Sequence, residues 1–246
     1  MRIDRLLCEL NLGSRSEVKA LIKSGRILVN KERVLRPDLK VDEESVVISY
    51  QGREYRYRPF VYYMMNKPAG VLSATRDSAC RTVLSLFMEQ CGPANGGELS
   101  GIPVQDIFPV GRLDKDTVGL LLLTNDGELA HRLLSPRFHV PKTYYVETDF
   151  PLPAEKGAAL EAGVDIGDKE PTRKAVVTPL ADLSCTITIT EGRFHQVKRM
   201  FQTQGLTVTY LKRLSMGGLA LDPGLSEGQI RELTKEEVDL LWQKTC

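Results

Sequence analysis

The sequence predicts an α+β protein made of a small N-terminal domain and a larger second domain. Its 246 residues are enough for one large domain or two smaller ones. Segments with helical spacing of apolar residues and segments with strand-like patterns follow one another along the chain. Residues 1–58 hold 13 Lys and Arg against 9 Asp and Glu, whereas the remainder holds 20 against 23. We therefore predict domains spanning residues 1–58 and 59–246.

The composition argues against several classes of protein. No window approaches the ~18 consecutive apolar residues of a membrane span. The N-terminus carries acidic residues within an amphipathic pattern, unlike a signal peptide. The five cysteines include no C-x-x-C pair, so neither a zinc site nor a disulfide framework is expected. They are Cys8, Cys80, Cys91, Cys185 and Cys246. A reducing cytoplasm is the expected location.

The first domain is expected to begin with two helices. Four apolar residues recur at helical spacing near the N-terminus: Ile3, Leu6, Leu7 and Leu10. Ser14 and Glu17 form a capping-box pattern that begins a second helix, which ends at Ser24-Gly25. Strands are expected at residues 26–30 and 45–50. Residues 51–59 form either a linker or a strand pair that leads into one.

Cations mark the exposed face of the second helix. They are Arg15, Lys19 and Lys23, with Arg26 in the loop that follows. Taken alone, such a run is usually a solvated surface. The order helix, Ser-Arg, basic helix, G-R-x-x-V-N is more specific and resembles the S4 RNA-binding domain from Arg2 to about Val47. The resemblance implies that these four residues contact RNA phosphates, which gives salt-dependent affinity with little sequence readout.

The second domain is expected to begin with a strand at residues 61–66, followed by the turn Lys67-Pro68-Ala69-Gly70. A short helix is predicted over residues 82–89 from the spacing of its apolar residues. Residues 91–100 are rich in Gly and read as a surface loop. Residues 105–110 then lead into residues 110–127, the most informative segment of this domain.

That stretch, residues 110–127, reads V-G-R-L-D-K-D-T-V-G-L-L-L-L-T-N-D-G. Its four consecutive leucines, bounded by Gly119 and a turn, predict a short buried strand. Asp114 lies at the rim of this strand, between Arg112 and Lys115. One interpretation is a loop carboxylate that accepts backbone hydrogen bonds. The alternative is a carboxylate kept ionised in a cleft, which suits a nucleophile or a base.

The remaining elements alternate between helices and strands. Asp126 is expected to cap a helix that ends at Ser135-Pro136. Residues 142–146 are rich in β-branched and aromatic residues and predict a strand, on which Tyr144 and Tyr145 point to opposite faces. Further helices are predicted over residues 152–162 and 235–242. Further strands are predicted at 176–177, 185–190 and 208–214.

Residues 191–200, E-G-R-F-H-Q-V-K-R-M, are expected to form a turn that leads into a helix. The spacing places Phe194, Val197 and Met200 on one apolar stripe. Lys198 borders that stripe and Arg199 lies away from it. Lys198 is therefore the cation best placed to lean into a partly buried cleft, or else a lysine at the margin of the core.

The string G-R-L-D-x-x-T-x-G-L-L-L, from Gly111 to Leu122, resembles the catalytic motif of RNA pseudouridine synthases. The N-K-P-x-G, K-T-Y and E-G-R-F-H-Q-V-K-R-M segments match that family in the same order. The resemblance implies a catalytic domain on a mixed, mainly antiparallel sheet with flanking helices. It also implies isomerisation of uridine, with no cofactor and no metal. Lys67 in the first motif either faces the RNA or is a solvated turn lysine.

The resemblance assigns roles to five residues of the second domain. Asp114 is the essential residue, acting as nucleophile or base at the ribose. Tyr144 is the active-site tyrosine, and Lys198 pairs with Asp114 and keeps it ionised. Arg112 is expected to bind the substrate or its backbone, and Met216 to form an apolar wall beside the base.

Gly111 is typical of the RsuA type, which modifies small-subunit (16S) rRNA, because RluA-type enzymes more often have His at this place. The expected partner is therefore ribosomal RNA, either naked or in an assembly particle, and the expected state is a cytoplasmic monomer with no membrane partner. Two alternatives stay open. One is a sister enzyme acting on large-subunit (23S) rRNA. The other is a non-catalytic RNA-binding factor in ribosome assembly.

Overall fold

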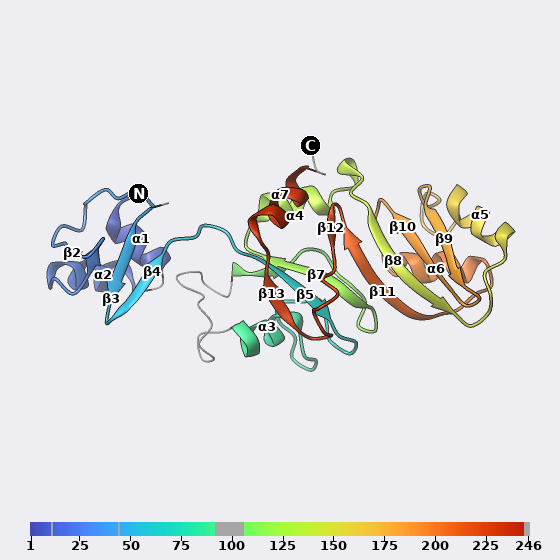
Figure 1. Cartoon of the computed structure of the whole chain (residues 1–246), viewed down its shortest axis with the longest axis horizontal. Helices are drawn as coiled ribbons and strands as arrows, with labels where there is room; N and C mark the ends of the chain where they lie inside the picture. The colour runs from blue at the N-terminus through green and yellow to red at the C-terminus, as the bar shows by residue number, and fades with distance from the viewer. Residues whose placement is uncertain (11, 44, 92–105, 244–246) are drawn as a thin grey trace. The chain divides into compact units, whose positions relative to one another are not determined.

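The computed structural model describes residues 1–10, 12–43, 45–91 and 106–243. The chain divides into two compact units, residues 1–61 with 87–107 and residues 62–86 with 108–246 (Figure 1). Each unit has its own sheet and its own cluster of buried apolar side chains. The predicted α+β class is confirmed. The Gly-rich loop predicted over residues 91–100 lies, apart from Cys91, outside the described residues.

Two helices open the first unit, α1 (Ile3–Glu9) and α2 (Arg15–Lys23). The predicted capping box is present, and the Ser14 N–H donates to Glu17 Oε2 at 2.7 Å. The buried face of α2 carries Val18, Leu21 and Ile22. Its other face is exposed, so the amphipathic pattern of the sequence is confirmed.

An antiparallel sheet in the order β2-β1-β3-β4 follows these helices in the N-terminal segment of this unit. Its strands are β1 (Leu28–Val29), β2 (Glu32–Arg33), β3 (Val47–Tyr50) and β4 (Arg53–Arg56). Of the two predictions for residues 51–59, a linker or a strand pair that leads into one, the pairing of β3 with β4 supports the second. Residues 53–56 pair with β3 and belong to this sheet, so they are not a linker.

The second unit is built on a sheet that has nine strands within the described residues. Seven of them run in the order β13-β5-β7-β11-β8-β10-β9 (Figure 1). These are β13 (Ile230–Glu232), β5 (Tyr62–Lys67), β7 (Val118–Thr124), β11 (Val208–Met216), β8 (Lys142–Thr148), β10 (Ser184–Ile189) and β9 (Val176–Ala181). The short strands β6 (Phe108–Pro109) and β12 (Leu219–Ala220) pair with β7 and β11. All pairs are antiparallel except β7 with β11, so the predicted mixed, mainly antiparallel sheet is confirmed.

Strand β7 lies inside this sheet, between β5 and β11. All seven of its residues are buried, as the run of four leucines predicts. Gly119 has a φ of 98°, and a Cβ there would lie 2.3 Å from the Arg213 carbonyl oxygen. Only Gly allows this close approach of β7 and β11. The N-terminal end of β7, which follows the loop that carries Asp114, thereby pairs closely with β11.

Four helices belong to the described part of this unit. They are α4 (Gly127–Leu134), α5 (Ala154–Ala162), α6 (Gln196–Thr203) and α7 (Lys235–Gln243), with a 3-10 turn at Pro136–Phe138. Helix α3 (Val83–Cys91) begins in this unit, and its residues from Phe87 onward are assigned to the first unit. Asp126 caps α4 as predicted, because its Oδ1 accepts from the Glu128 and Leu129 amides, each at 3.0 Å. Helices α4 and α7 contact each other and share a core with β5 and β7, while α6 packs against β11 (Figure 1).

Within the described part of the chain, no helix combines the length and the apolar character that crossing a membrane requires.

Candidate active site

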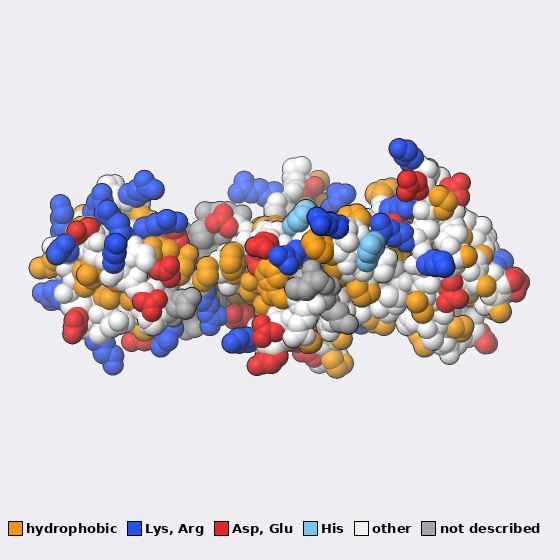
Figure 2. Space-filling model, turned by 90° about the horizontal axis from the view of Figure 1, so that it is seen from above, with side chains coloured by type: hydrophobic (Ala, Val, Ile, Leu, Met, Phe, Trp, Pro, Cys, Tyr) orange, Lys and Arg blue, Asp and Glu red, His pale blue; other side chains and the backbone are white. Residues whose placement is uncertain are grey.

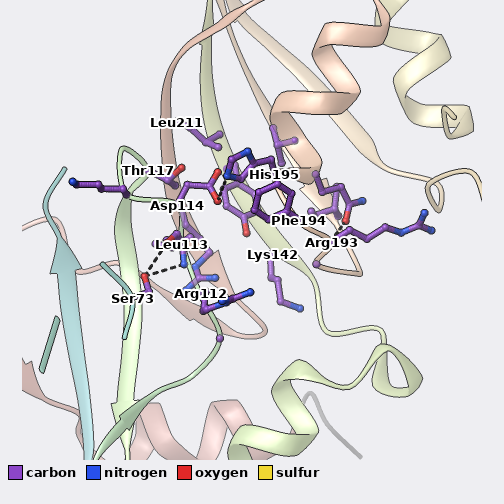
Figure 3. Close-up of a pocket in the computed structure, with 18 of the residues that line it drawn as sticks. Ser73, Arg112, Leu113, Asp114, Thr117, Lys142, Arg193, Phe194, His195 and Leu211 are labelled. Carbon is purple, nitrogen blue, oxygen red and sulfur yellow. Dashed lines mark hydrogen bonds and ion pairs between the residues drawn. The ribbon is translucent and has the colours of Figure 1, made fainter. Parts of the chain in front are cut away.

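A cavity of about 610 Å³ opens in the second unit (Figure 3). Most of its walls come from four parts of the unit: residues 72–74, the loop that precedes β7, the pocket-facing residues of β8 and β11, and the turn 192–197 that leads into α6. Leu134 of α4 and Ile189 of β10 complete the lining. These segments are far apart in sequence, and the sheet brings them together. The cavity therefore lies where three of the four motifs noted in the sequence converge.

The loop that carries Asp114 is anchored from two sides. Ser73 Oγ donates to the Leu113 carbonyl at 2.9 Å and accepts from the Leu113 amide at 3.0 Å (Figure 3). On the other side Lys67 Nζ donates to the carbonyls of Pro68, Lys115 and Thr117 at 3.0, 3.3 and 2.8 Å. The backbone around Asp114 is therefore fixed by two side chains that lie far from it in the sequence, at the end of β5 and in the segment that follows.

Lys67 is fully buried, so neither interpretation offered for it from the sequence is correct. Lys67 is not solvated and does not line the cavity within the described residues. Its ammonium donates hydrogen bonds to three backbone carbonyls inside the fold. Burial lowers its pKa to about 8, although the charges of Asp116 and Asp114 act in the opposite direction. Lys67 and Ser73 are thus positioning residues that sequence reasoning missed.

Asp114 projects into the cavity beside two cationic or ionisable groups. Its Oδ2 lies 3.3 Å from Lys198 Nζ, and its Oδ1 lies 3.4 Å from His195 Nε2. About a quarter of the Asp114 side chain is exposed. The structure therefore makes the contact expected between Asp114 and Lys198. His195 is a third member of the cluster that the sequence analysis did not name.

Lys198 is shared between two carboxylates. Its Nζ lies 2.5 Å from Asp116 Oδ1, which is a shorter contact than the one to Asp114. This hydrogen bond lowers the pKa of Asp116 below its ordinary value. Arg199 points elsewhere, as predicted, and pairs with Asp168 at 2.5 Å. Lys198 thus acts as a bridge that fixes Asp114 relative to the neighbouring loop residue.

Tyr144 forms part of the cavity wall. It is on β8, where buried and half-buried residues alternate, and it is 8% exposed. Tyr145 lies on the opposite face, as predicted, where its ring meets Tyr210 edge-on at 6.1 Å. Tyr144 therefore contributes an aromatic ring to the cavity wall.

The turn before α6 carries an exposed aromatic pair. The rings of Phe194 and His195 stack at 3.8 Å with an interplanar angle of 17° (Figure 3). Phe194 is 71% exposed, so its predicted place on a buried helical stripe is wrong. The reason is that α6 begins only at Gln196, after His195 adopts a left-handed conformation with a φ of 48°. The sequence gives no sign of this break in the helix.

Buried hydrogen bonds hold that turn in place. Glu191 is buried and accepts from the Arg173 amide at 2.9 Å and from Gln196 Nε2 at 2.8 Å. Its other oxygen pairs with Arg193 at 3.0 Å. The turn that carries the exposed rings of Phe194 and His195 is therefore held by hydrogen bonds to Glu191.

The two predicted substrate-binding residues differ in their placement. Arg112 is exposed and lines the cavity (Figure 3). Met216 is fully buried and is not among the described residues that line the cavity. It pairs with Lys142 at the far end of β11, where the core that includes Val140 and Leu219 covers the sheet. The prediction that Met216 forms an apolar wall beside the base is therefore wrong, because Met216 does not reach the cavity surface.

The four cations predicted to contact RNA, Arg15, Lys19, Lys23 and Arg26, are all exposed. In the described part of the chain none of them forms an ion pair with a carboxylate. Figure 2 shows many Lys and Arg side chains over one face of this unit. The exposed face of α2 and the loop after it therefore carry positive charge that is not paired with carboxylates of the described chain. Among the described residues no group of three or more His, Cys, Asp or Glu is placed to hold a metal ion.

Comparison with known proteins gives consistent matches over both units. A model of the RNA pseudouridylate synthase family matches residues 61–203, and a model of the S4 domain matches residues 1–47. The Bacillus subtilis protein named "Uncharacterized RNA pseudouridine synthase YtzG" is 46% identical over 98% of each chain. "Ribosomal small subunit pseudouridine synthase A" of Vibrio cholerae is 36% identical and covers 99% of this chain and 100% of its own.

The protein of the same name from Escherichia coli is also 36% identical, over 97% of this chain and 98% of its own. A solved structure described as "Crystal structure of pseudouridylate synthase" aligns with a TM-score of 0.66 and 34% identity. That alignment covers 98% of this chain and 99% of the other, so the resemblance extends over both units.

Proposed function

The chain belongs to the RNA pseudouridylate synthase family, and from that premise we propose that it isomerises a specific uridine of small-subunit (16S) rRNA to pseudouridine. The single observation that carries this proposal is Asp114, which lies in a cavity in contact with Lys198 and His195 and shares that cavity with Tyr144. The choice of small-subunit rRNA is supported by relatives that carry this substrate in their names and match over nearly their whole length.

The reaction exchanges one bond for another within a single nucleotide. The N1–C1′ bond breaks, the freed uracil turns, and a C5–C1′ bond forms while the C5 proton is lost and N1 gains one. All atoms are retained, so no redox or group-transfer cofactor is required. The target base is stacked in RNA and must first be extruded into the cavity.

Each residue of the cluster has a part in this scheme. Asp114 acts on the ribose, either as a nucleophile at C1′ or as a base. Lys198 and His195 hold its carboxylate in place through both oxygens. Tyr144 provides a stacking surface for the uracil, worth roughly 1–3 kcal/mol. A cytoplasmic location and a monomeric state remain predictions that accompany an rRNA substrate.

Mapping pseudouridines in rRNA from cells that lack this chain tests the proposal. We expect one 16S site to return to uridine, and the purified chain to restore it with release of tritium from 5-tritiated uridine. Testing naked 16S rRNA beside an assembly particle identifies the substrate form. Loss of a 23S site instead would identify the sister enzyme, and no change in either RNA would favour a non-catalytic factor.

Removing the unpaired positive charges of α2 and the following loop is expected to weaken RNA binding and to reduce the salt dependence of the affinity. Each phosphate contact contributes a slope of about −0.7 to −0.9 to the dependence of log affinity on log salt. Replacing Arg15, Lys19, Lys23 and Arg26 with Gln should flatten that slope by up to about 3. Filter binding of 16S rRNA fragments from 50 to 300 mM salt measures it. The matched control changes Lys31 and Lys40, which are exposed cations of the same unit. An equal effect of this control would remove the specific role of α2.

Phe194→Ala is expected to weaken RNA binding by about tenfold, because an exposed ring at the cavity rim offers a stacking surface for a nucleotide beside the target. Phe194→Tyr should retain the affinity. Phe150→Ala is the control, since Phe150 is 64% exposed and does not line the cavity within the described residues. If Phe194→Ala binds as tightly as the wild type, the ring does not stack on RNA.

A further inference from the structure

Two buried cations line the cavity apart from the Asp114 cluster. Lys142 is 6% exposed and Arg213 is 2% exposed, and both belong to the cavity wall. Lys142 and Tyr144 are two residues apart on β8 and therefore share a face of the sheet. Arg213 is the cross-strand partner of Tyr144 on β11. The three residues are thus neighbours on adjoining strands, and all three line the cavity.

The hydrogen bonds of these cations leave donors unused. Arg213 Nε donates to the Leu120 carbonyl at 2.7 Å, but its buried Nη2 meets no acceptor among the described residues. Lys142 Nζ donates to the Val140 carbonyl at 3.0 Å. Neither cation pairs with a carboxylate of the described chain. Buried charges are normally paired, so this cluster is suited to an acceptor that a ligand brings.

The electrostatics of Lys142 point in the same direction. Burial lowers the pKa of Lys142 to about 8, and the positive charge of Arg213 adds to this effect. The site therefore disfavours a second positive charge and favours a negative one. Negative charge that develops in a buried site is stabilised more strongly than in water.

Isomerisation of uridine creates such a charge on the base. When the N1–C1′ bond breaks, its electron pair leaves with N1, and the resulting uracil anion spreads the charge onto O2 and O4. This holds whether Asp114 attacks C1′ or removes a proton from the ribose. The charge persists until C5 bonds to C1′, after which C5 loses its proton and N1 gains one.

We propose that Lys142 and Arg213 are catalytic groups that donate hydrogen bonds to the carbonyl oxygens of the departing uracil and stabilise it as an anion. This inference rests on the proposed uridine isomerisation. In Figure 3 the Lys142 side chain extends away from the Asp114 carboxylate. Asp114, Lys142 and Arg213 line the same cavity, so the proposal requires a nucleotide whose ribose lies at Asp114 and whose base points toward the two cations. Its phosphates stay with the chain at the mouth of the cavity, where Arg112 is exposed.

The test varies the leaving group and the cation together. Fluorine at C5 withdraws electrons and makes the uracil a better leaving group, so it needs less help from the protein. Wild type and Lys142→Met are compared in single-turnover cleavage of the N1–C1′ bond, on 16S rRNA fragments with uridine or 5-fluorouridine at the target. Lys142→Met is expected to slow the uridine reaction by about 10²–10³-fold, the usual cost of one such donor. Its penalty on 5-fluorouridine should be at least about tenfold smaller.

Further variants keep the outcome interpretable. Lys142→Arg, which retains the charge, should recover much of the uridine rate, and Arg213→Lys should show the same leaving-group dependence as Lys142→Met. Arg112→Met is the matched cation control, and its penalty should be equal on both RNAs. The affinity of Lys142→Met for RNA should stay within about threefold of the wild type. Its far-UV and near-UV circular dichroism should match the wild type.

Equal penalties of Lys142→Met on the two RNAs would overturn the inference. So would a loss confined to RNA affinity, which would identify a phosphate contact instead. A wild-type chain that forms no pseudouridine in any rRNA would defeat the proposed function itself. Because the wild-type reaction on uridine is part of the same experiment, the two failures are distinguishable.

Discussion

Asp114→Asn is expected to abolish pseudouridine formation, with a loss of at least about 10⁴-fold, while RNA affinity stays within about threefold. The substitution keeps the shape of the side chain and removes its charge. An amide can neither attack C1′ nor accept a proton from the ribose at a useful rate. Binding should persist because the first unit and the cavity wall are unchanged. Tritium release from 5-tritiated uridine in 16S rRNA gives the rate, and filter binding gives the affinity.

The matched control is Asp116→Asn, two residues along the same loop. Asp116 makes the shorter contact to Lys198, yet about three quarters of its side chain is exposed. Its loss frees Lys198 to pair with Asp114 alone, so we expect a change of no more than about tenfold. Measurable conversion by Asp114→Asn above the enzyme-free reaction would contradict the role of Asp114. Equal inactivity of both variants would show that the charge of the loop, not Asp114 itself, is required.

Features of the fold that depend on local patterns could be predicted from the sequence. The run from Leu120 to Leu123 gave a buried strand, and Asp126 capped the next helix. Alternation along β8 separated Tyr144 from Tyr145. Such features arise from neighbours within a few residues, where period and capping chemistry act directly.

Features that depend on distant contacts could not be predicted. Local spacing predicts a turn at Lys67, because two of its three carbonyl partners lie about fifty positions away in the sequence. The resemblance predicts Met216 beside the base, but an irregularity in register between Arg213 and Ser215 precedes it on β11. His195 escaped notice because its approach to Asp114 requires a left-handed residue before the helix. Side-chain position in these cases follows from tertiary packing, not from spacing.

Lys67→Met is expected to lower both stability and activity. Met fills a similar volume but leaves the Pro68 and Thr117 carbonyls without their donor, and an unpaired buried acceptor costs about 1–3 kcal/mol. Removing a buried ammonium offsets part of this loss, so we expect a net destabilisation of about 2 kcal/mol at pH 7. The loop should shift Asp114 and slow isomerisation by about 10–100-fold, since small misplacements are costly. Urea unfolding and tritium release measure the two effects.

The pH dependence of this destabilisation identifies its cause. The pKa of Lys67 is about 8 in the fold against 10.5 for the free group, so the unfolded chain binds more protons between these values. The free energy of unfolding of the wild type therefore rises with pH through this window, by about 2 kcal/mol from pH 7 to pH 9.5 for this group. Lys67→Met lacks this contribution, so the difference in stability between wild type and variant should grow by that amount. Other groups titrate in the same window, but they are common to both proteins and cancel.

Lys115→Met is the control for this pH dependence, because its side chain is exposed and its backbone carbonyl, which accepts from Lys67, is retained. We expect its difference from the wild type to stay constant across the window. If the difference in the free energy of unfolding between wild type and Lys67→Met also stayed constant, burial would not lower the pKa of Lys67 in the fold. In that case the anchoring of the Asp114 loop would rest on Ser73 and the Gly70 amide, which also bonds the Lys115 carbonyl at 2.8 Å.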